Sequence, residues 1–297
     1  MLSISLFIFI LLLIATLIIE YKLASNNTME NKNNRQRIYT WWVITLICIP
    51  VLYIGGWAIT LLVYVLIYWA MYELSKLLDF NFNSLTIALF TTAMISYHFI
   101  ALSFNNEYGL FFIIPFIIYL ILFYMSKAMS NITDLHRSLM LVLCVTSLFT
   151  IELISVLCNS LPYDAGLVIL FLFFLTASND IFQYICGKLF GHKQLAPVVS
   201  KNKTYEGALG GVVLTTILSM MITPYVFSVN ILIAAGTGFL IAILGIVGDL
   251  NISYLKRRVN VKDAGNSLPG HGGLLDRIDS LILTAPGFGL FLSLIST

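Results

Sequence analysis

The sequence is poor in charged residues: only 10% of its 297 residues are Asp, Glu, Lys or Arg, whereas 59% are hydrophobic. Soluble domains carry about 25% charged residues, so this composition excludes a soluble globular protein. The net charge of +2 is too small to indicate a nucleic-acid partner. Cysteine is scarce as well, and the four cysteines lie in or beside apolar segments without paired spacing. That pattern favours apolar packing over disulfides or metal ligation.

Long apolar segments are what the sequence has in abundance. They run for about 17–21 residues without charge, which is the length a helix needs to cross a bilayer. They do not alternate as the strands of a membrane β-barrel do. We therefore predict an all-α, polytopic helical membrane protein with about 9–10 transmembrane helices. The ten predicted spans are residues 2–19, 38–54, 57–73, 84–104, 109–127, 138–160, 165–187, 206–227, 230–250 and 280–296.

Two of these boundaries depend on short turns. The apolar run from Trp41 to Tyr72 is too long for a single crossing. The pair Gly55 and Gly56 is the natural place to divide it. The second short turn is predicted near Ser228.

The basic residues lie on one predicted side of the membrane. All 16 Lys and Arg residues fall in alternate connections or at the adjoining helix ends, and the other connections hold none. By the positive-inside rule the basic side is cytoplasmic. We therefore expect a multi-pass protein of a bacterial-type inner (cytoplasmic) membrane. The basic connections are residues 20–37, 74–83, 128–137, 188–205 and 251–279.

The segment 248–280 contains both signs of charge, a histidine and several glycines, a mixture that a purely solvated loop does not need. If the ninth span continues as a helix past Leu250, Asp249, Ser253 and Lys256 lie at positions i, i+4 and i+7 on one face. A carboxylate, a hydroxyl and an ammonium then meet at the membrane boundary.

A glycine-rich turn, Pro269 to Gly273, comes shortly before Asp276 at the start of the last span. Free backbone N–H groups at a helix start suit phosphate oxygens. Asp249 and Asp276 suit hard cations such as Mg²⁺, which takes one or two carboxylates together with substrate phosphates. Carboxylates, basic residues and a glycine turn together predict metal-assisted phosphoryl or nucleotidyl transfer.

With its spacing intact, this segment resembles the signature of phosphatidate cytidylyltransferases, the CDP-diacylglycerol synthases. The resemblance covers roughly residues 170–297, and the N-terminal half matches only as membrane helices. The residues that carry it are Ser253, Leu255, Lys256, Arg257, Lys262, Asp263, Gly265, Leu268, Pro269, His271, Gly272, Gly273, Leu274, Asp276, Arg277, Ile278 and Asp279.

A second segment resembles the same family more loosely. Residues 179–191 are similar to its aspartate–tyrosine–glycine stretch, and residues 195–211 to its serine–lysine–threonine–glutamate–glycine stretch. Gln183 and Lys188 stand where alanine and arginine are usual, and Lys201 where proline is common. These departures put the substrate and the level of activity in question.

The resemblance implies CTP:phosphatidate cytidylyltransferase activity in phospholipid biosynthesis. A phosphatidate phosphate oxygen attacks the α-phosphorus of CTP, giving CDP-diacylglycerol and pyrophosphate. It also implies one or two Mg²⁺ ions per site, with Asp249 and Asp276 as metal ligands, and a homodimer. CTP, phosphatidic acid and membrane lipids are then the partners. On this basis residues 1–160 are N-terminal membrane helices, and residues 161–297 are a catalytic membrane domain with cytoplasmic loops 188–205 and 251–279.

Further roles follow as hypotheses, because positioning and charge stabilisation dominate phosphoryl transfer. The nucleophile is already anionic, so His271 is assigned as a phosphate contact or turn residue rather than a base. The predicted catalytic residues are Lys256, Arg257, Lys262, Asp263, His271, Arg277 and Asp279. The predicted substrate- or nucleotide-binding residues are Asp180, Ser200, Lys203, Thr204, Glu206, Ser253, Gly272 and Gly273.

Several alternatives remain open at this stage. Asp263 and Asp279 either contact metal or orient a neighbouring basic side chain, and Glu206 either caps the next helix or contacts the site. For the protein as a whole, the alternatives are a related CTP-dependent enzyme acting on another lipid phosphate or a polyprenol-type alcohol, and a catalytically silent lipid-binding homologue. A transporter is disfavoured, because its ionisable residues would gather near the bilayer midplane.

Overall fold

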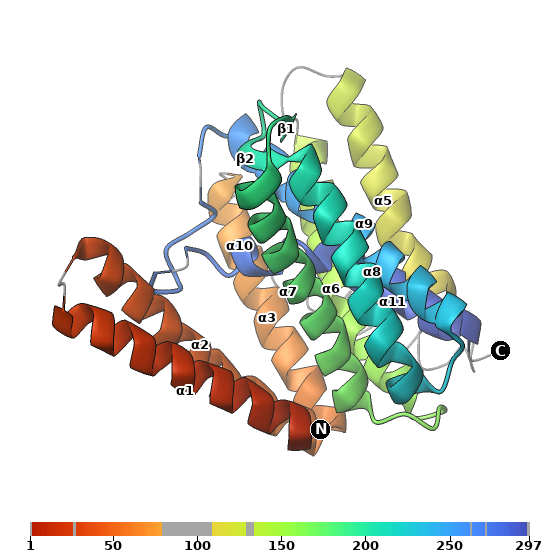
Figure 1. Cartoon of the computed structure of the whole chain (residues 1–297). Coiled ribbons are helices and arrows are strands. Elements are labelled where there is room, and N and C mark those ends of the chain that lie inside the picture. The colour runs from red at the N-terminus through yellow and green to blue at the C-terminus, as the bar shows by residue number, and fades with distance from the viewer. Residues whose placement is uncertain are drawn as a thin grey trace.

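The computed structural model describes residues 2–25, 28–78, 109–128, 134–261, 263–270 and 272–295. Long helices make up nearly all of this part of the chain, together with one short antiparallel hairpin of strands (Figure 1). Element labels follow Figure 1. In chain order they are α1 (Leu2–Ser25), α2 (Met29–Ile54), α3 (Gly56–Leu77), α5 (Gly109–Ala128), α6 (Asp134–Cys158), α7 (Ala165–Phe190), β1 (Gln194–Ala196), β2 (Ser200–Thr204), α8 (Tyr205–Phe227), α9 (Ile231–Arg258), α10 (Leu275–Ile278) and α11 (Leu281–Ile295).

Eight segments of the described chain are long and apolar enough to cross a membrane as helices, and α5 adds a shorter apolar segment. The prediction of a polytopic helical membrane protein is therefore confirmed. Nine of the ten predicted spans coincide with α1, α2, α3, α5, α6, α7, α8, α9 and α11. The remaining predicted span, 84–104, lies outside the described residues.

Both predicted turns are present. Gly55 has φ +69° and Gly56 has φ +41°, backbone conformations that glycine adopts easily, and they separate α2 from α3. Ser228 ends α8 in the left-handed conformation, with φ +53°. Two residues later the Asn230 side chain accepts a hydrogen bond from the backbone N–H of Ile233 at 2.9 Å and so begins α9.

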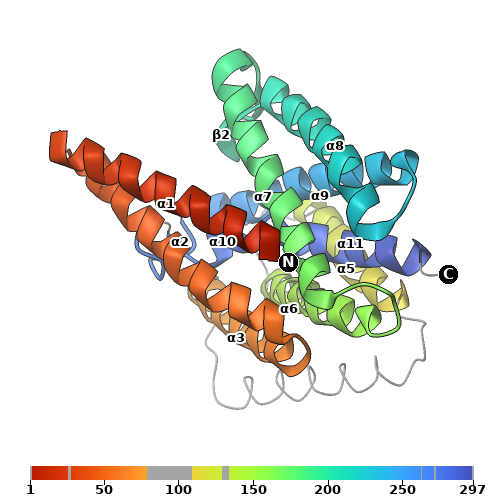
Figure 2. The same cartoon turned by 60° about the horizontal axis from the view of Figure 1, so that its bottom comes forward.

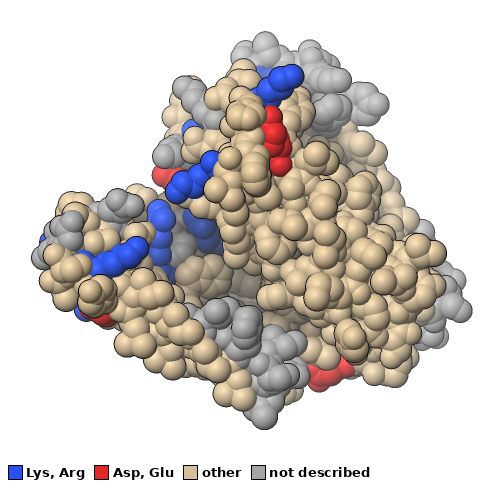
Figure 3. Space-filling model, in the orientation of Figure 1, with Lys and Arg blue, Asp and Glu red and all other residues tan. Residues whose placement is uncertain are grey.

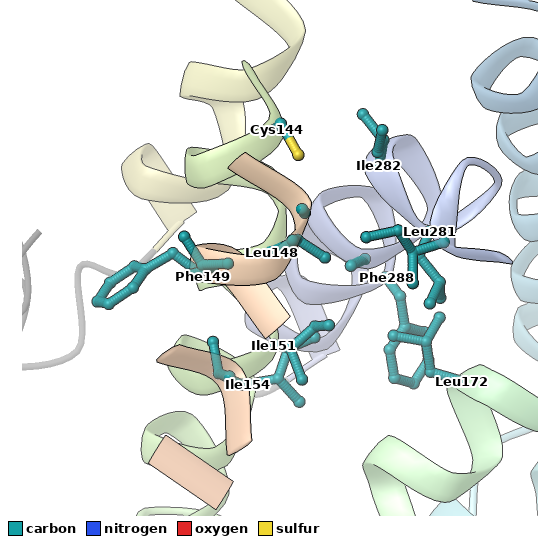
Figure 4. Close-up of a cluster of buried hydrophobic side chains, with 14 of the residues drawn as sticks. Cys144, Leu148, Phe149, Ile151, Ile154, Leu172, Leu281, Ile282 and Phe288 are labelled. Carbon is teal, nitrogen blue, oxygen red and sulfur yellow. The ribbon is translucent and has the colours of Figure 1, made fainter. Parts of the chain in front are cut away.

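The helices form two unequal groups. The antiparallel pair α1 and α2 extends away from the rest of the molecule, as both views show (Figures 1 and 2). In the rest of the molecule, α3, α5, α7 and α11 pack against α6, most of whose side chains are buried, and α8 and α9 pack against α7. Figure 4 shows part of this core, where Leu148 and Ile151 of α6 lie with Leu172 of α7 and Phe288 of α11. Because the core draws on α3, α6, α7 and α11, residues from both sides of position 160 stabilise it together.

Lysine residues gather at one end of the bundle. Lys76, Lys188 and Lys256 lie in the last turns of α3, α7 and α9, and the β1–β2 hairpin with Lys203 packs against α7, α8 and α9. We call this the basic end. On the face seen in Figure 3, Lys and Arg side chains lie over the upper part of the molecule and in a hollow beside the α1–α2 pair. The opposite end carries the turns at Gly55 and Ser228.

Candidate active site

Asp249 lies on α9, which continues as a helix to Arg258, well past Leu250. The Ser253 hydroxyl, one turn later, donates a hydrogen bond to Asp249 Oδ1 at 3.1 Å. Lys203 reaches Asp249 from β2, with 2.5 Å between Nζ and Oδ2. The two side chains are 19% and 22% exposed, although the Nζ atom of Lys203 is itself buried. The predicted approach of a carboxylate and a hydroxyl at the end of this helix is therefore present.

Asp276 accepts hydrogen bonds from three donors. Lys256 Nζ donates to its Oδ1 at 2.7 Å, and the backbone N–H groups of Ala264 and Gly273 donate to its Oδ2 at 2.9 and 3.0 Å. The Lys256 and Asp276 side chains are only 9% and 6% exposed. Asp276 thus connects both ends of the loop 263–273 to α9.

A second group of carboxylates lies beside Asp249. Asp180 of α7 accepts hydrogen bonds from Ser280 Oγ at 3.0 Å and from Gln183 Nε2 at 3.3 Å. Asp279 accepts a hydrogen bond from the backbone N–H of Ser280 at 2.9 Å. The negative charge of Asp249 acts on both Asp180 and Asp279. Lys203 and Arg277 partly offset it at Asp180, and Lys256 partly offsets it at Asp279. Four separate segments of the chain therefore contribute charges to one cluster.

Close backbone packing brings these segments together. A Cβ atom on Gly248 would lie 2.8 Å from the carbonyl oxygen of Asp279 and 3.1 Å from that of Ser280. Only a residue without a side chain allows this approach. Since Gly248 precedes Asp249, the approach of α9 to the 279–280 turn places the Asp249 and Asp279 carboxylates in the same cluster.

The cluster contains carboxylate oxygens, which are the ligand type that Mg²⁺ takes. Among the residues that the structure describes, no group of three His, Cys, Asp or Glu side chains is arranged to hold a metal ion. Mg²⁺ does not need one, because it keeps several waters and binds through one or two carboxylates and substrate phosphates. Asp249, with its partly exposed carboxylate, is the more accessible of the two predicted ligands. The oxygens of both carboxylates face groups of the protein: Ser253 and Lys203 at Asp249, and Lys256 with two backbone N–H groups at Asp276.

Two of the predicted binding residues fix local structure. Thr204 caps α8, its hydroxyl accepting from the backbone N–H of Gly207 at 3.1 Å. Glu206 is partly exposed and accepts hydrogen bonds from the backbone N–H groups of His192 and Lys193. Both side chains therefore secure the connection between α7 and α8. Ser200 begins β2.

Other predicted residues lie around the loop. Arg257 donates to the carbonyl oxygens of Val199 and Val261, at 3.2 and 2.8 Å, and so links the hairpin to the start of the loop. Gly272 has φ +84°, and its carbonyl accepts from the N–H of Leu268 at 2.8 Å, which closes the turn. Asp263 and Arg277 are exposed. Lys262 and His271 lie outside the described residues.

Sequence reasoning missed side chains from the N-terminal half that contact this loop. Glu73 of α3 accepts hydrogen bonds from the loop, and Arg37 and Thr40 of α2 donate to its carbonyl groups. Ser280, which donates to Asp180, was missed as well. Glu73 had a recognisable signal: an ionisable residue within an apolar span is costly and usually functional, the argument that selected Asp180.

Comparison with known proteins identifies related chains. A family model described as "Cytidylyltransferase family" matches residues 35–295. The protein YnbB of Escherichia coli (strain K12), described as uncharacterized, is 52% identical over 127 residues, which cover 43% of each chain. The phosphatidate cytidylyltransferase of Helicobacter pylori (strain ATCC 700392 / 26695) is 44% identical over 125 residues, covering 42% of this chain and 47% of that protein.

A third relative, the phosphatidate cytidylyltransferase of Rickettsia bellii (strain RML369-C), is 38% identical over 162 residues, covering 51% of this chain and 68% of that protein. The aligned part of the chain thus spans less than half the length of the first two relatives.

Proposed function

The chain belongs to the cytidylyltransferase family, and from this membership we propose that it is a CTP:phosphatidate cytidylyltransferase, which forms CDP-diacylglycerol and pyrophosphate. Relatives that bear this name support the substrate class. The observation that carries the proposal is the cluster at the basic end. There, carboxylates and lysines from α7, β2, α9 and the loop after it meet at the end of membrane-spanning helices.

The position of the cluster suits one lipid and one water-soluble substrate. Phosphatidate remains in the bilayer while CTP arrives from water, so the reaction has to occur at the membrane boundary. The hollow beside the α1–α2 pair, where Lys and Arg side chains lie (Figure 3), is where we propose that the acidic lipid head group approaches. Positive side chains attract and orient such a group.

In the proposed reaction, a phosphate oxygen of phosphatidate forms a bond to the α-phosphorus of CTP, and the bond to pyrophosphate breaks. The nucleophile is anionic, so no side chain has to remove a proton. The protein's task is to hold two anions in line and to offset their charge. The Lys203 side chain is 19% exposed and that of Lys256 is 9% exposed, so we assign the phosphate contact to Lys203, while Lys256 holds Asp276 in place.

We propose that Asp249 and Asp276 hold one or two Mg²⁺ ions. Bound metal would supply positive charge for the reacting phosphates and the leaving pyrophosphate. Ser253 orients Asp249, and the N–H groups of Ala264 and Gly273 orient Asp276. The prediction that Arg257, Lys262, Asp263, His271, Arg277 and Asp279 assist catalysis belongs to the same proposal.

The orientation and assembly of the protein are also part of this proposal. With the basic end in the cytoplasm of a bacterial cell, the site faces the compartment that supplies CTP, in agreement with the positive-inside rule. A homodimer follows from the family resemblance alone, and crosslinking in membranes tests it.

The experiment is an assay of purified full-length protein in detergent with CTP and phosphatidate, measuring both pyrophosphate release and lipid-linked CMP. We expect turnover with Mg²⁺, none with EDTA, and a loss of roughly 100-fold or more in kcat for Asp249→Asn and Asp276→Ala. Asp164→Asn is the matched control. Asp164 caps α7 through the N–H of Leu167 at 2.8 Å, and asparagine caps a helix equally well.

One observation favours a second candidate, the same chemistry on another lipid phosphate. Gln183, which stands where the family usually has alanine, donates its hydrogen bond directly to Asp180 in the cluster. Turnover with another lipid phosphate or a polyprenol-type alcohol, but not with phosphatidate, would select that candidate. Absence of turnover with all of them would reject the enzyme assignment in favour of a silent lipid-binding homologue.

A further inference from the structure

Glu73 is a buried carboxylate near the end of α3, and its side chain contacts the loop that contains Asp276. The residue is 4% exposed. Its Oε1 accepts from the backbone N–H of Leu274 at 2.9 Å, and its Oε2 from that of Leu275 at 2.8 Å. The hydroxyl of Ser267 donates to Oε1 as well. A residue of the N-terminal half therefore receives three hydrogen bonds from the C-terminal loop.

The pattern of donors requires a carboxylate at this position. All three partners of Glu73 present hydrogen atoms, so an amide in its place would turn an N–H₂ group toward at least one N–H donor. The backbone N–H groups at the first turn of a helix have no partner within the helix. Glu73 supplies that partner at the start of α10 and keeps these donors bonded where water has little access.

Glycines allow the loop backbone to approach Glu73. A Cβ atom on Gly273 would lie 2.6 Å from Glu73 Oε2 and 2.8 Å from the backbone nitrogen of Gly265. A Cβ atom on Gly265 would lie 3.3 Å from Glu73 Oε1. Any side chain at position 273 would displace the carboxylate or the loop, so the two glycines and Glu73 form one fitted contact.

The contact with Glu73 fixes the backbone directly before Asp276. Leu275 donates to Glu73, while the next residue, Asp276, accepts from Ala264, Gly273 and Lys256. The loop is therefore held by two carboxylates, one from α3 and one of its own. If the Glu73 carboxylate is lost, the backbone that carries Asp276 is no longer fixed in the position from which Asp276 reaches Lys256.

Helix α2 holds the tip of the same loop. Arg37 Nε donates to the carbonyl oxygen of Gly270 at 2.8 Å, and Thr40 Oγ1 donates to that of Pro269 at 2.8 Å. Gly270 has φ +73°, and a Cβ atom there would lie 3.1 Å from the backbone nitrogen of Arg37. Two N-terminal helices thus contact the loop at two separate places.

We propose that Glu73 is a positioning residue, which holds the loop 263–279 in the conformation that presents Asp276 and Lys256 to the reacting phosphates and their metal. Its effect on turnover rests on the proposed function, whereas its effect on the loop does not. The two effects are therefore measured separately.

The first measurement is amide hydrogen–deuterium exchange of the full-length protein in detergent, which requires no turnover. In Glu73→Gln we expect exchange in the segment 264–279 to be about tenfold or more faster than in the unsubstituted protein, because hydrogen bonds to a charged group are lost. Exchange in α8 should not change. Glu152→Gln is the matched control: Glu152 is another buried glutamate, on α6, and contacts Thr60 rather than the loop.

The second measurement is kinetic. Glu73→Gln should lower kcat and raise the Mg²⁺ concentration needed for half-maximal turnover several-fold, with KM for the lipid little changed. Glu73→Asp should recover part of both effects, and Glu152→Gln should show neither. A purely structural role would reduce the yield of folded protein but leave the Mg²⁺ dependence of the folded fraction unchanged.

Unchanged exchange in segment 264–279 of Glu73→Gln would overturn the proposal. If that variant does not fold, Ser267→Ala tests the same point, since it removes one donor to Glu73 and should speed exchange to a smaller degree. The two proposals can also fail separately. If the unsubstituted protein is inactive, but loop exchange is normal in Glu152→Gln and fast in Glu73→Gln, the proposed function is rejected while the role of Glu73 in the loop stands.

Discussion

Asp249 and Asp276 each face a lysine, but the two pairs lie in different surroundings. Asp249 and Lys203 join α9 to the β-hairpin, and both side chains are about one-fifth exposed, at 22% and 19%. Asp276 and Lys256 join the loop to α9, and their side chains are 6% and 9% exposed. The Asp276 carboxylate also accepts hydrogen bonds from two backbone N–H groups. We call these two pairs the open pair and the enclosed pair.

The difference indicates a division of labour between the two pairs. An ion pair that water partly reaches contributes less net stability than a fully enclosed one, because water and salt weaken the attraction. Its partners can therefore separate and bind a phosphate or a cation at a small cost in free energy. An enclosed pair behaves differently, since removal of one partner leaves an uncompensated charge where solvation is poor. The open pair is suited to ligand exchange, and the enclosed pair keeps the loop in the conformation that presents Asp276 and Lys256.

The largest expected effect comes from breaking the enclosed pair. Lys256→Met should lower the free energy of unfolding by about 3–5 kcal/mol, because Asp276 loses its counter-charge in a buried setting. Lys203→Met should lower it by less, because the Asp249 side chain is 22% exposed and water can solvate its charge once the lysine is gone. Denaturation of both variants in the same detergent compares them. Equal losses would show that the two surroundings do not differ in the way described.

An intermediate effect is expected from the backbone around the enclosed pair. Gly273→Ala places a methyl group 2.6 Å from Glu73 Oε2 and should destabilise the protein by about 1–3 kcal/mol through overpacking. Gly236→Ala in α9 is the matched control. A Cβ there meets nothing within 4 Å, and alanine favours a helix by up to about 1 kcal/mol over glycine. Thermal unfolding distinguishes them, and a neutral Gly273→Ala would contradict the close fit.

The smallest expected effect is on the open pair. Ser253→Ala removes one hydrogen bond to Asp249, so kcat should fall by about threefold to tenfold while stability changes little. Ser293→Ala serves as control, because its hydroxyl donates to the carbonyl of Leu290 near the end of α11, at 2.7 Å. An unchanged kcat in Ser253→Ala would remove Ser253 from the set of residues that orient Asp249.

The features that sequence predicted well are those set by neighbouring residues. Apolar runs of bilayer length predicted the helices, and Gly55 with Gly56 predicted the division between α2 and α3. The spacing of Asp249 and Ser253 predicted a shared helix face, because helical periodicity depends only on position in the chain. These predictions needed no knowledge of which helix lies beside which.

The features that sequence reasoning missed depend on contacts between distant segments. Lys256 was expected beside Asp249 on one face, yet its ion pair is with Asp276, twenty residues later. The hairpin of β1 and β2 has strands of only three and five residues, too short for a clear alternating pattern. Glu73 carried a local signal, but the loop it contacts could be identified only after α3 had been placed.

The contacts of Glu73, Arg37 and Thr40 with the loop also impose an order on biosynthesis, since they join residues separated by about 200 positions. Synthesis at about 5–20 residues per second leaves α3 without this partner for roughly 10–40 s. Throughout that interval the nascent protein holds a glutamate at the membrane boundary without its final donors. A chain that ends before Leu274 therefore keeps Glu73 without the two backbone donors that it has in the complete protein.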